Sequence, residues 1–164
     1  MEPFLQDIDI WCWRYKENTR NYPGVNLTAT TDGCDALLKV IELLEQEGPG
    51  SRRTVPLRQL DPKDEAKVSG GQRYRNFKKL RLCLAERTAD LQQMCVSHDG
   101  ETATVEIVSQ ELDQLKDSIA EVRRGRGDFG IAPDTRRKGT YGPKDKASEI
   151  LTFWPCFGHC WVVS

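Results

Sequence analysis

The chain has 164 residues, of which 38% are hydrophobic and 30% are charged, and its formal net charge is −1. This composition is typical of a soluble globular protein, and the length fits a single globular domain over residues 1–164. The near-neutral charge argues against a general polyanion binder. No apolar run approaches the roughly 18 residues of a membrane span, so no membrane partner is expected.

The amino-terminal stretch MEPFLQDIDI is acidic and lacks the basic and apolar regions of a secretory signal. We therefore expect a cytoplasmic location. The six cysteines are scattered along the sequence. In a reducing compartment we expect them to stay as thiols and to pack as small hydrophobic residues.

Residues 4–15, FLQDIDIWCWRY, fit two patterns of secondary structure. Helical spacing would place Phe4, Ile8 and Trp11 on one face, whereas a strand would alternate Ile8 and Ile10 with their neighbours. We favour the helix here. The strand remains the alternative.

Residues 18–30 are interpreted as a loop, and the clearest helix follows at 31–47. Its apolar residues recur at helical spacing and form one stripe. Thr31 or Asp32 is expected to cap its free amides. The Gly-Pro-Gly sequence at 48–50 is expected to end it.

Two strands are expected next. Residues 54–60 alternate as an edge strand does, and residues 77–85 alternate leucines with basic residues. The second segment is therefore predicted to be half-buried, with a basic outer face.

The following segments predict a hairpin and a helix. Asp-Gly within 98–101 lies between two β-rich runs, 91–97 and 102–108, and such a dipeptide is a strong hairpin signal. Ser109 is expected to cap a helix that stops at Gly125.

The last part of the chain differs from the rest in composition. Residues 123–146 are rich in Gly, Pro and Arg without periodicity, and we predict a long exposed basic loop with a short strand at 129–131. The apolar end should return a strand to the core. The predicted fold class is α+β, an antiparallel sheet of about four to five strands with two or three helices packed on one face.

The tripeptide Gly70-Gly71-Gln72 resembles the one with which class I release factors hydrolyse peptidyl-tRNA. In this chain Arg73 and the two residues after it replace the His-Val-Asn that usually follows, and the carboxyl terminus is apolar where small relatives are basic. We interpret the tripeptide as a turn. A hydrolase with this loop or with a Cys nucleophile such as Cys83 is kept as a third functional hypothesis.

The carboxyl-terminal CFGHC supplies Cys156, His159 and Cys160. Structural zinc sites need four ligands, commonly two separated pairs, and the sequence offers no second pair. We therefore predict neither a metal nor a cofactor, and we interpret these residues as part of a buried strand.

Charge is separated along the chain. Residues 51–87 carry eleven Lys or Arg against four Asp or Glu, and residues 123–146 carry eight against three. We expect these segments to form an Arg-rich binding surface. The alternative is that the acidic helix 109–122 and the acidic amino-terminal half neutralise these side chains within the fold. The predicted binding residues are Arg73, Tyr74, Arg75, Lys79, Arg81, Arg124, Arg126, Arg136, Arg137 and Lys138.

The sequence therefore favours a small non-enzymatic binding protein that engages a protein partner, for example as a toxin-neutralising protein or an adaptor. The alternative is a protein that binds single-stranded RNA. In that case Arg and aromatic side chains on one sheet face would hold phosphates and stack bases.

Overall fold

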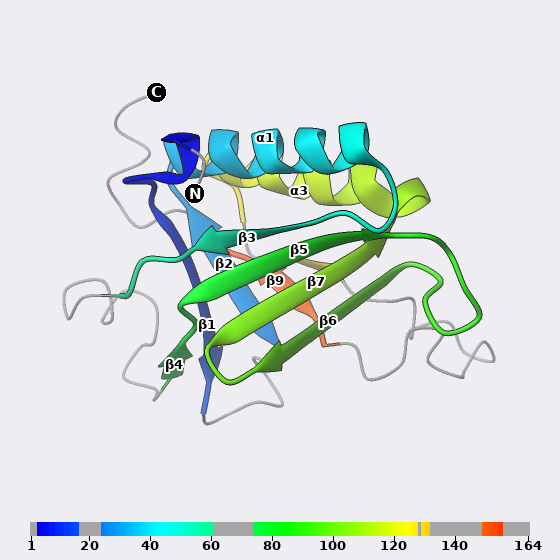
Figure 1. Cartoon of the computed structure of the whole chain (residues 1–164). Helices are drawn as coiled ribbons and strands as arrows, with labels where there is room; N and C mark the ends of the chain where they lie inside the picture. The colour runs from blue at the N-terminus through cyan, green and yellow to red at the C-terminus, as the bar shows by residue number, and fades with distance from the viewer. Residues whose placement is uncertain (1–2, 17–23, 61–73, 128, 132–148, 156–164) are drawn as a thin grey trace.

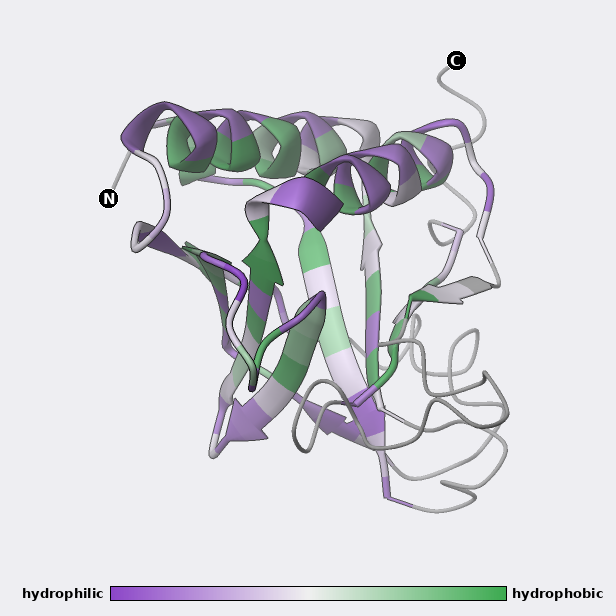
Figure 2. Ribbon diagram, turned by 90° about the vertical axis from the view of Figure 1, so that its right-hand side faces the viewer, coloured by the Kyte–Doolittle hydropathy of each residue, from purple (hydrophilic) through white to green (hydrophobic). Residues whose placement is uncertain are grey.

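A computed structural model describes residues 3–16, 24–60, 74–127, 129–131 and 149–155 of the chain. Within these residues, two β-sheets face each other, and two helices lie side by side along one side of the pair (Figures 1 and 2). Hydrophobic and hydrophilic residues alternate along several strands, as Figure 2 shows. No helix in these ranges is both long and apolar enough to cross a membrane.

The predicted α+β class is confirmed, with the strands divided between two sheets. The five-stranded sheet has the order β4-β1-β2-β9-β8, and the four-stranded sheet has the order β3-β5-β7-β6. Most neighbours are antiparallel, but β2 pairs with β9 and β5 pairs with β7 in parallel. The elements are β1 (Ile10–Tyr15), β2 (Val25–Ala29), α1 (Thr31–Glu47), β3 (Arg52–Pro56), β4 (Tyr74–Asn76), β5 (Lys79–Ala85), β6 (Met94–Asp99), β7 (Thr102–Val108), α3 (Leu112–Arg123), β8 (Phe129–Ile131) and β9 (Leu151–Phe153).

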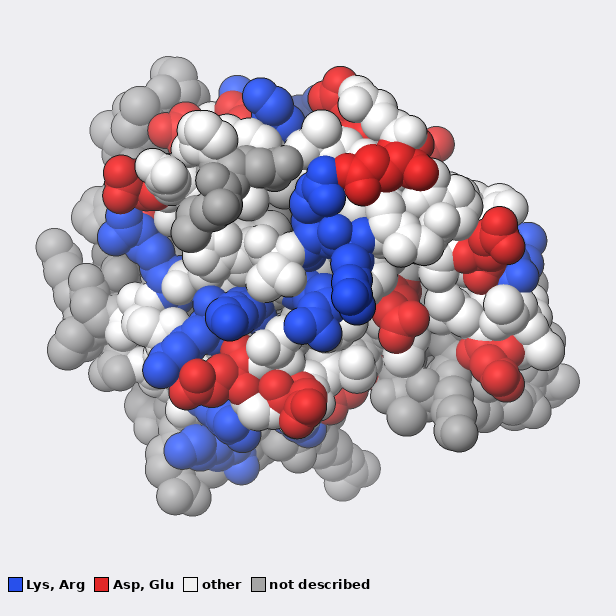
Figure 3. All heavy atoms as spheres, in the orientation of Figure 1, with Lys and Arg blue, Asp and Glu red and all other residues white. Residues whose placement is uncertain are grey.

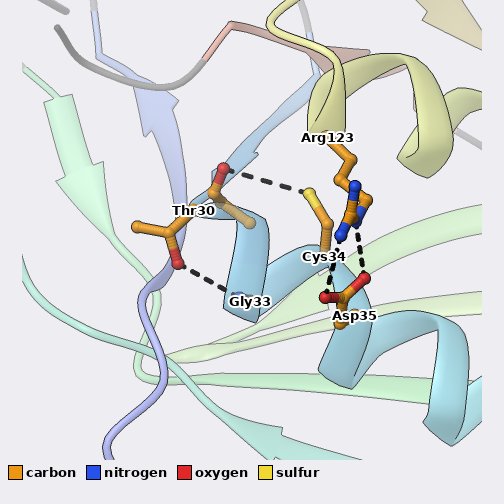
Figure 4. Close-up of polar contacts among 6 residues, drawn as sticks. Thr30, Gly33, Cys34, Asp35 and Arg123 are labelled. Atoms are coloured by element: carbon orange, nitrogen blue, oxygen red, sulfur yellow. Dashed lines mark hydrogen bonds and ion pairs between the residues drawn. The ribbon is translucent and has the colours of Figure 1, made fainter. Parts of the chain in front are cut away.

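The cap of α1 lies one residue earlier than expected. Thr30 keeps an extended backbone, and its Oγ1 accepts a hydrogen bond from the backbone N–H of Gly33 at 3.1 Å (Figure 4). The cap is therefore Thr30 and not Thr31 or Asp32, because a capping residue lies outside the helical backbone. At the other end, Gly48 has φ = 87°, which favours glycine, and it ends the helix as predicted.

Ion pairs join α3 to α1 at both ends of their contact. Nε of Arg123, in the last turn of α3, lies 2.7 Å from Oδ1 of Asp35, the fifth residue of α1 (Figure 4). Toward the other end, Nζ of Lys116 lies 2.6 Å from Oε1 of Glu45. These contacts make the two helices antiparallel neighbours.

The predicted cap of the second helix is wrong. Ser109 begins a short 3-10 turn, and the side chain of Glu111, which precedes α3, forms no capping hydrogen bond. The helix still ends at the predicted place, because Gly125 follows it with φ = 83°. The strand expected at 129–131 is β8. It pairs with β9, the strand returned by the apolar end of the chain.

The helix favoured for residues 4–15 is wrong, because residues 10–15 form the strand β1. Ile10 and Cys12 lie in the main core between the sheets, whereas the three aromatic residues of β1 form a second apolar cluster with Leu60. Both faces of the strand are buried, so its hydrophobicity does not alternate. The short 3-10 turn Pro3–Leu5 precedes this strand.

The strand β2 lies inside residues 18–30, so the loop interpretation was wrong for 25–29. Asn26 and Thr28 are polar but buried, and each is satisfied by Trp154. Nε1 of Trp154 donates to Oδ1 of Asn26 at 2.8 Å, and Oγ1 of Thr28 donates to the Trp154 carbonyl at 2.9 Å. These bonds allow a polar strand to occupy the middle of a sheet.

Candidate functional site

The strand β5 gives the four-stranded sheet one apolar and one basic face. Leu80, Leu82 and Leu84 are buried against the core, while Lys79 and Arg81 lie on the opposite face. The other sheet and the helices pack on the inner face. Among the described elements, no helix or strand lies over the outer face (Figure 1).

Strand pairing brings further side chains to this outer face. The register places Thr54, Arg81 and Thr104 in one row across β3, β5 and β7. Arg52 is a diagonal neighbour of Arg81, and such neighbours lie about 7–8 Å apart. Lys79 is two residues before Arg81 and therefore shares its face. We call these five residues the basic face.

The cations of the basic face differ from most arginines in the described ranges. Within these ranges Arg52, Lys79 and Arg81 form no ion pair, and Arg75 is the third arginine without one. Figure 3 shows Lys and Arg side chains gathered in a band over the front of the molecule, where β3 and β5 lie. The seven other arginines of the ten described each pair with a carboxylate, namely Arg14, Arg53, Arg58, Arg87, Arg123, Arg124 and Arg126.

Arg124 and Arg126, two predicted binding residues, share one carboxylate. Nη1 of each lies 3.0 Å from an oxygen of Glu121. The hydrogen bond from Arg126, with a smaller contribution from Arg124, lowers the pKa of Glu121. Both residues follow α3, so they lie outside the basic face and are partly neutralised.

The predicted basic segment 73–81 is divided between the two sheets. Tyr74 and Arg75 belong to β4, which pairs with β1 in the five-stranded sheet. Tyr74 is half-buried against the aromatic residues of β1, and Arg75 is exposed. Phe77 is fully buried, with its ring centroid 5.6 Å from that of His98. Neither aromatic residue lies on the basic face.

An open groove of ≈ 690 Å³ borders the basic face where β5 ends, and its lining includes Arg52, Cys83 and Glu106. Burial raises the pKa of the Cys83 thiol, and Glu106 raises it further. Arg81 and Arg52 act in the opposite direction, with smaller effect. A raised pKa keeps the thiol protonated near pH 7, which is opposite to the activation of a Cys nucleophile.

Metal ligands do not gather in the ranges that the structure describes, where no three His, Cys, Asp or Glu side chains are placed to hold an ion. Several predicted features fall outside these ranges. They are Arg73, Arg136, Arg137 and Lys138, the tripeptide Gly70-Gly71-Gln72, and the residues Cys156, His159 and Cys160.

No family model, curated protein or solved structure matches this chain. Function is then argued from the geometry and charge of the site. Sequence reasoning missed Arg52, Thr54 and Thr104 as members of the basic face. The alternation within 52–56 places Arg52 and Thr54 on one face of β3, but their position beside Arg81 depends on which strands pair.

Proposed function

We propose that this chain is a non-enzymatic binding protein that engages an acidic protein partner through the basic face. The observation that carries the proposal is the lack of an ion pair at Arg52 and Arg81 within the described residues, where seven of the ten arginines have one. Adjacent cations that the fold does not neutralise attract an anionic surface and steer its approach.

Exposure of one sheet face does not by itself indicate a binding surface, because antiparallel sheets commonly face water on one side. Such a face is expected to carry mixed charges that pair with one another. The outer face does carry Glu106 on β7, one strand away from β5. The cations on β3 and β5 nevertheless form no ion pair with it, so positive charge is concentrated on two strands.

The partner is proposed to be a protein because the basic face has no aromatic member. Single-stranded nucleic acids are held by bases stacked on aromatic side chains, interleaved with cations. Tyr74 and Phe77 were the aromatic residues expected for that role. Tyr74 packs against β1 in the other sheet, and Phe77 is fully buried. RNA binding is therefore the alternative function, and the experiment must distinguish it from binding of a protein.

The sequence adds a second contact region, which stays a prediction. Arg136, Arg137 and Lys138 are expected to contribute to partner capture, and charge reversal of all three tests this directly. The result is independent of the basic face, because each region can be varied alone.

The experiment is affinity capture with the immobilised full-length chain, followed by identification of the bound protein and direct titration with the purified protein. Support requires an acidic protein that binds directly and that R52Q/R81Q no longer retains. Treatment with ribonuclease separates the alternative, since loss of all bound material after treatment would assign the face to RNA. Retention by R52Q/R81Q equal to that of the unaltered chain would overturn the proposal.

A further inference from the structure

We infer that the group received by the basic face is a phosphoryl group carried by the partner protein. This inference rests on the proposed function, because it names the chemistry of the partner at the same site. A phosphorylated side chain carries about −1.5 to −2 charges at pH 7 and three strong acceptor oxygens. The basic face offers three cations and two hydroxyl groups as donors.

The spacing of the cations favours a dianion over a carboxylate. One guanidinium can satisfy a carboxylate by itself through two parallel hydrogen bonds. Arg52 and Arg81 are diagonal neighbours on one face, with a separation of about 7–8 Å between their attachment points, so both side chains can reach one central group. Lys79 adds a third positive charge from the same face.

Two hydroxyl groups complete the set of donors. Thr54 and Thr104 lie on either side of Arg81 in the same row across the sheet. Within the described residues, neither hydroxyl forms a hydrogen bond with another side chain or the backbone. Hydroxyl donors beside guanidinium groups suit the several oxygens of a phosphoryl group.

The positive region is also bounded, which favours one charged group over a long polyanion. On the same face, Asp99 of β6 lies in the row of Lys79, with Thr102 between them. Glu106 of β7 lies in the row of Arg52, with Cys83 between them. A nucleic acid strand would need a track of cations that continues past these carboxylates.

The test is an amide NMR titration of the full-length chain with three short peptides that differ at one residue, phosphoserine, glutamate or serine. Inorganic phosphate serves as a fourth probe and shows whether the free ion suffices. We expect phosphoserine to shift the amides of β3 and β5, with affinity about tenfold or more above that of glutamate. Binding should weaken as pH falls through the second phosphate pKa of about 6.

Two variants and one control make the result specific. R81Q and R52Q should each weaken phosphoserine binding about tenfold, whereas R124Q/R126Q should leave it unchanged. R81Q and R52Q lie at exposed or half-buried positions, and the amide spectrum itself reports whether each is folded. Shifts confined to other parts of the chain would overturn the inference.

The outcome also separates this inference from the proposed function. Equal affinity for the phosphoserine and glutamate peptides, or no binding of either while an acidic protein is still captured, would overturn the phosphoryl assignment and leave the proposed function standing. Capture that survives phosphatase treatment of the partner would do the same. Failure of capture altogether would remove both.

Discussion

Arg123 and Asp35 join the end of α3 to the start of α1 through two contacts, 2.7 Å from Nε to Oδ1 and 3.3 Å from Nη2 to Oδ2 (Figure 4). Most arginines of the described residues form an ion pair of this kind. Arg123 lies in the last turn of α3, where its positive charge also suits the dipole of that helix. Seven of the ten described arginines are therefore held by carboxylates of the fold, whereas Arg52 and Arg81 of the basic face are not.

Removal of the Asp35 carboxylate should destabilise the helix pair modestly. We expect D35N to lower the free energy of unfolding by about 0.2–1 kcal/mol, the range for ion pairs at exposed positions. Urea denaturation measures the change. D117N is the matched control, since Asp117 is an exposed aspartate of α3. Equal midpoints for D35N and D117N would show that the pair contributes nothing to stability.

The pKa of Glu121 depends on the two arginines that follow α3. Because Arg126 is the main cause of the lowered pKa, R126Q should raise it toward its ordinary value, and R124Q should raise it less. The pairing stabilises the folded chain above the ordinary carboxyl pKa, and this contribution is lost as pH falls through the lowered value. NMR titration of the Glu121 carboxyl carbon measures both shifts. A larger change in R124Q than in R126Q would contradict this assignment.

The reactivity of Cys83 should follow the charges around it. Since Glu106 disfavours the thiolate, E106Q should move the pH midpoint of Cys83 alkylation downward, and R81Q should move it upward. Peptide-resolved mass spectrometry after iodoacetamide treatment measures the midpoint. Cys34, whose pKa is raised to about 12 chiefly by burial, is a slow internal reference. A Cys83 midpoint below that of an ordinary thiol would instead indicate an activated nucleophile.

The part-buried hydrogen bond between Trp154 and Asn26 should hold the last described segment onto β2. N26A leaves the indole N–H without its acceptor inside the protein, and we expect a loss of about 1–3 kcal/mol. W154F removes the donor, so a double-mutant cycle isolates the bond itself. The coupling should be about 0.5–1.5 kcal/mol. Additive effects of the two substitutions would show that the bond between Asn26 and Trp154 contributes nothing to stability.

Local patterns predicted the elements whose two sides differ. In β5, leucines alternate with polar residues, and the strand has one buried and one open face as expected. In α1 the apolar stripe and Gly48 gave the correct length. The hairpin of β6 and β7 followed from Asp-Gly in its turn.

The elements that were missed are buried on both sides or are polar and buried. The residues of β1 belong to two apolar clusters, one on each face of the strand, so hydrophobic and polar residues do not alternate along it. The spacing of its apolar residues therefore also fitted a helix. In β2, the polar residues Asn26 and Thr28 led to the prediction of a loop. Their hydrogen-bond partner, Trp154, is distant in the sequence. Long-range hydrogen bonds of this kind leave no local signal.

The same limit applies to the candidate site. Lys79 and Arg81 could be assigned to an outer face from their own strand, but Arg52 enters the basic face only because β3 pairs with β5. Arg124 and Arg126 carried the same sequence signal and are paired with Glu121. Sequence composition locates positive charge, and only the fold decides which charges remain free for a partner.

Isothermal titration of the purified partner into the unaltered chain, R52Q/R81Q and R124Q/R126Q measures how much of the affinity comes from the basic face. Both double variants remove two positive charges, so their net charge is the same. We predict that Kd rises about tenfold or more for R52Q/R81Q and changes less than about twofold for R124Q/R126Q. Equal weakening of both variants, or an unchanged Kd for R52Q/R81Q, would contradict the assignment of partner binding to the basic face.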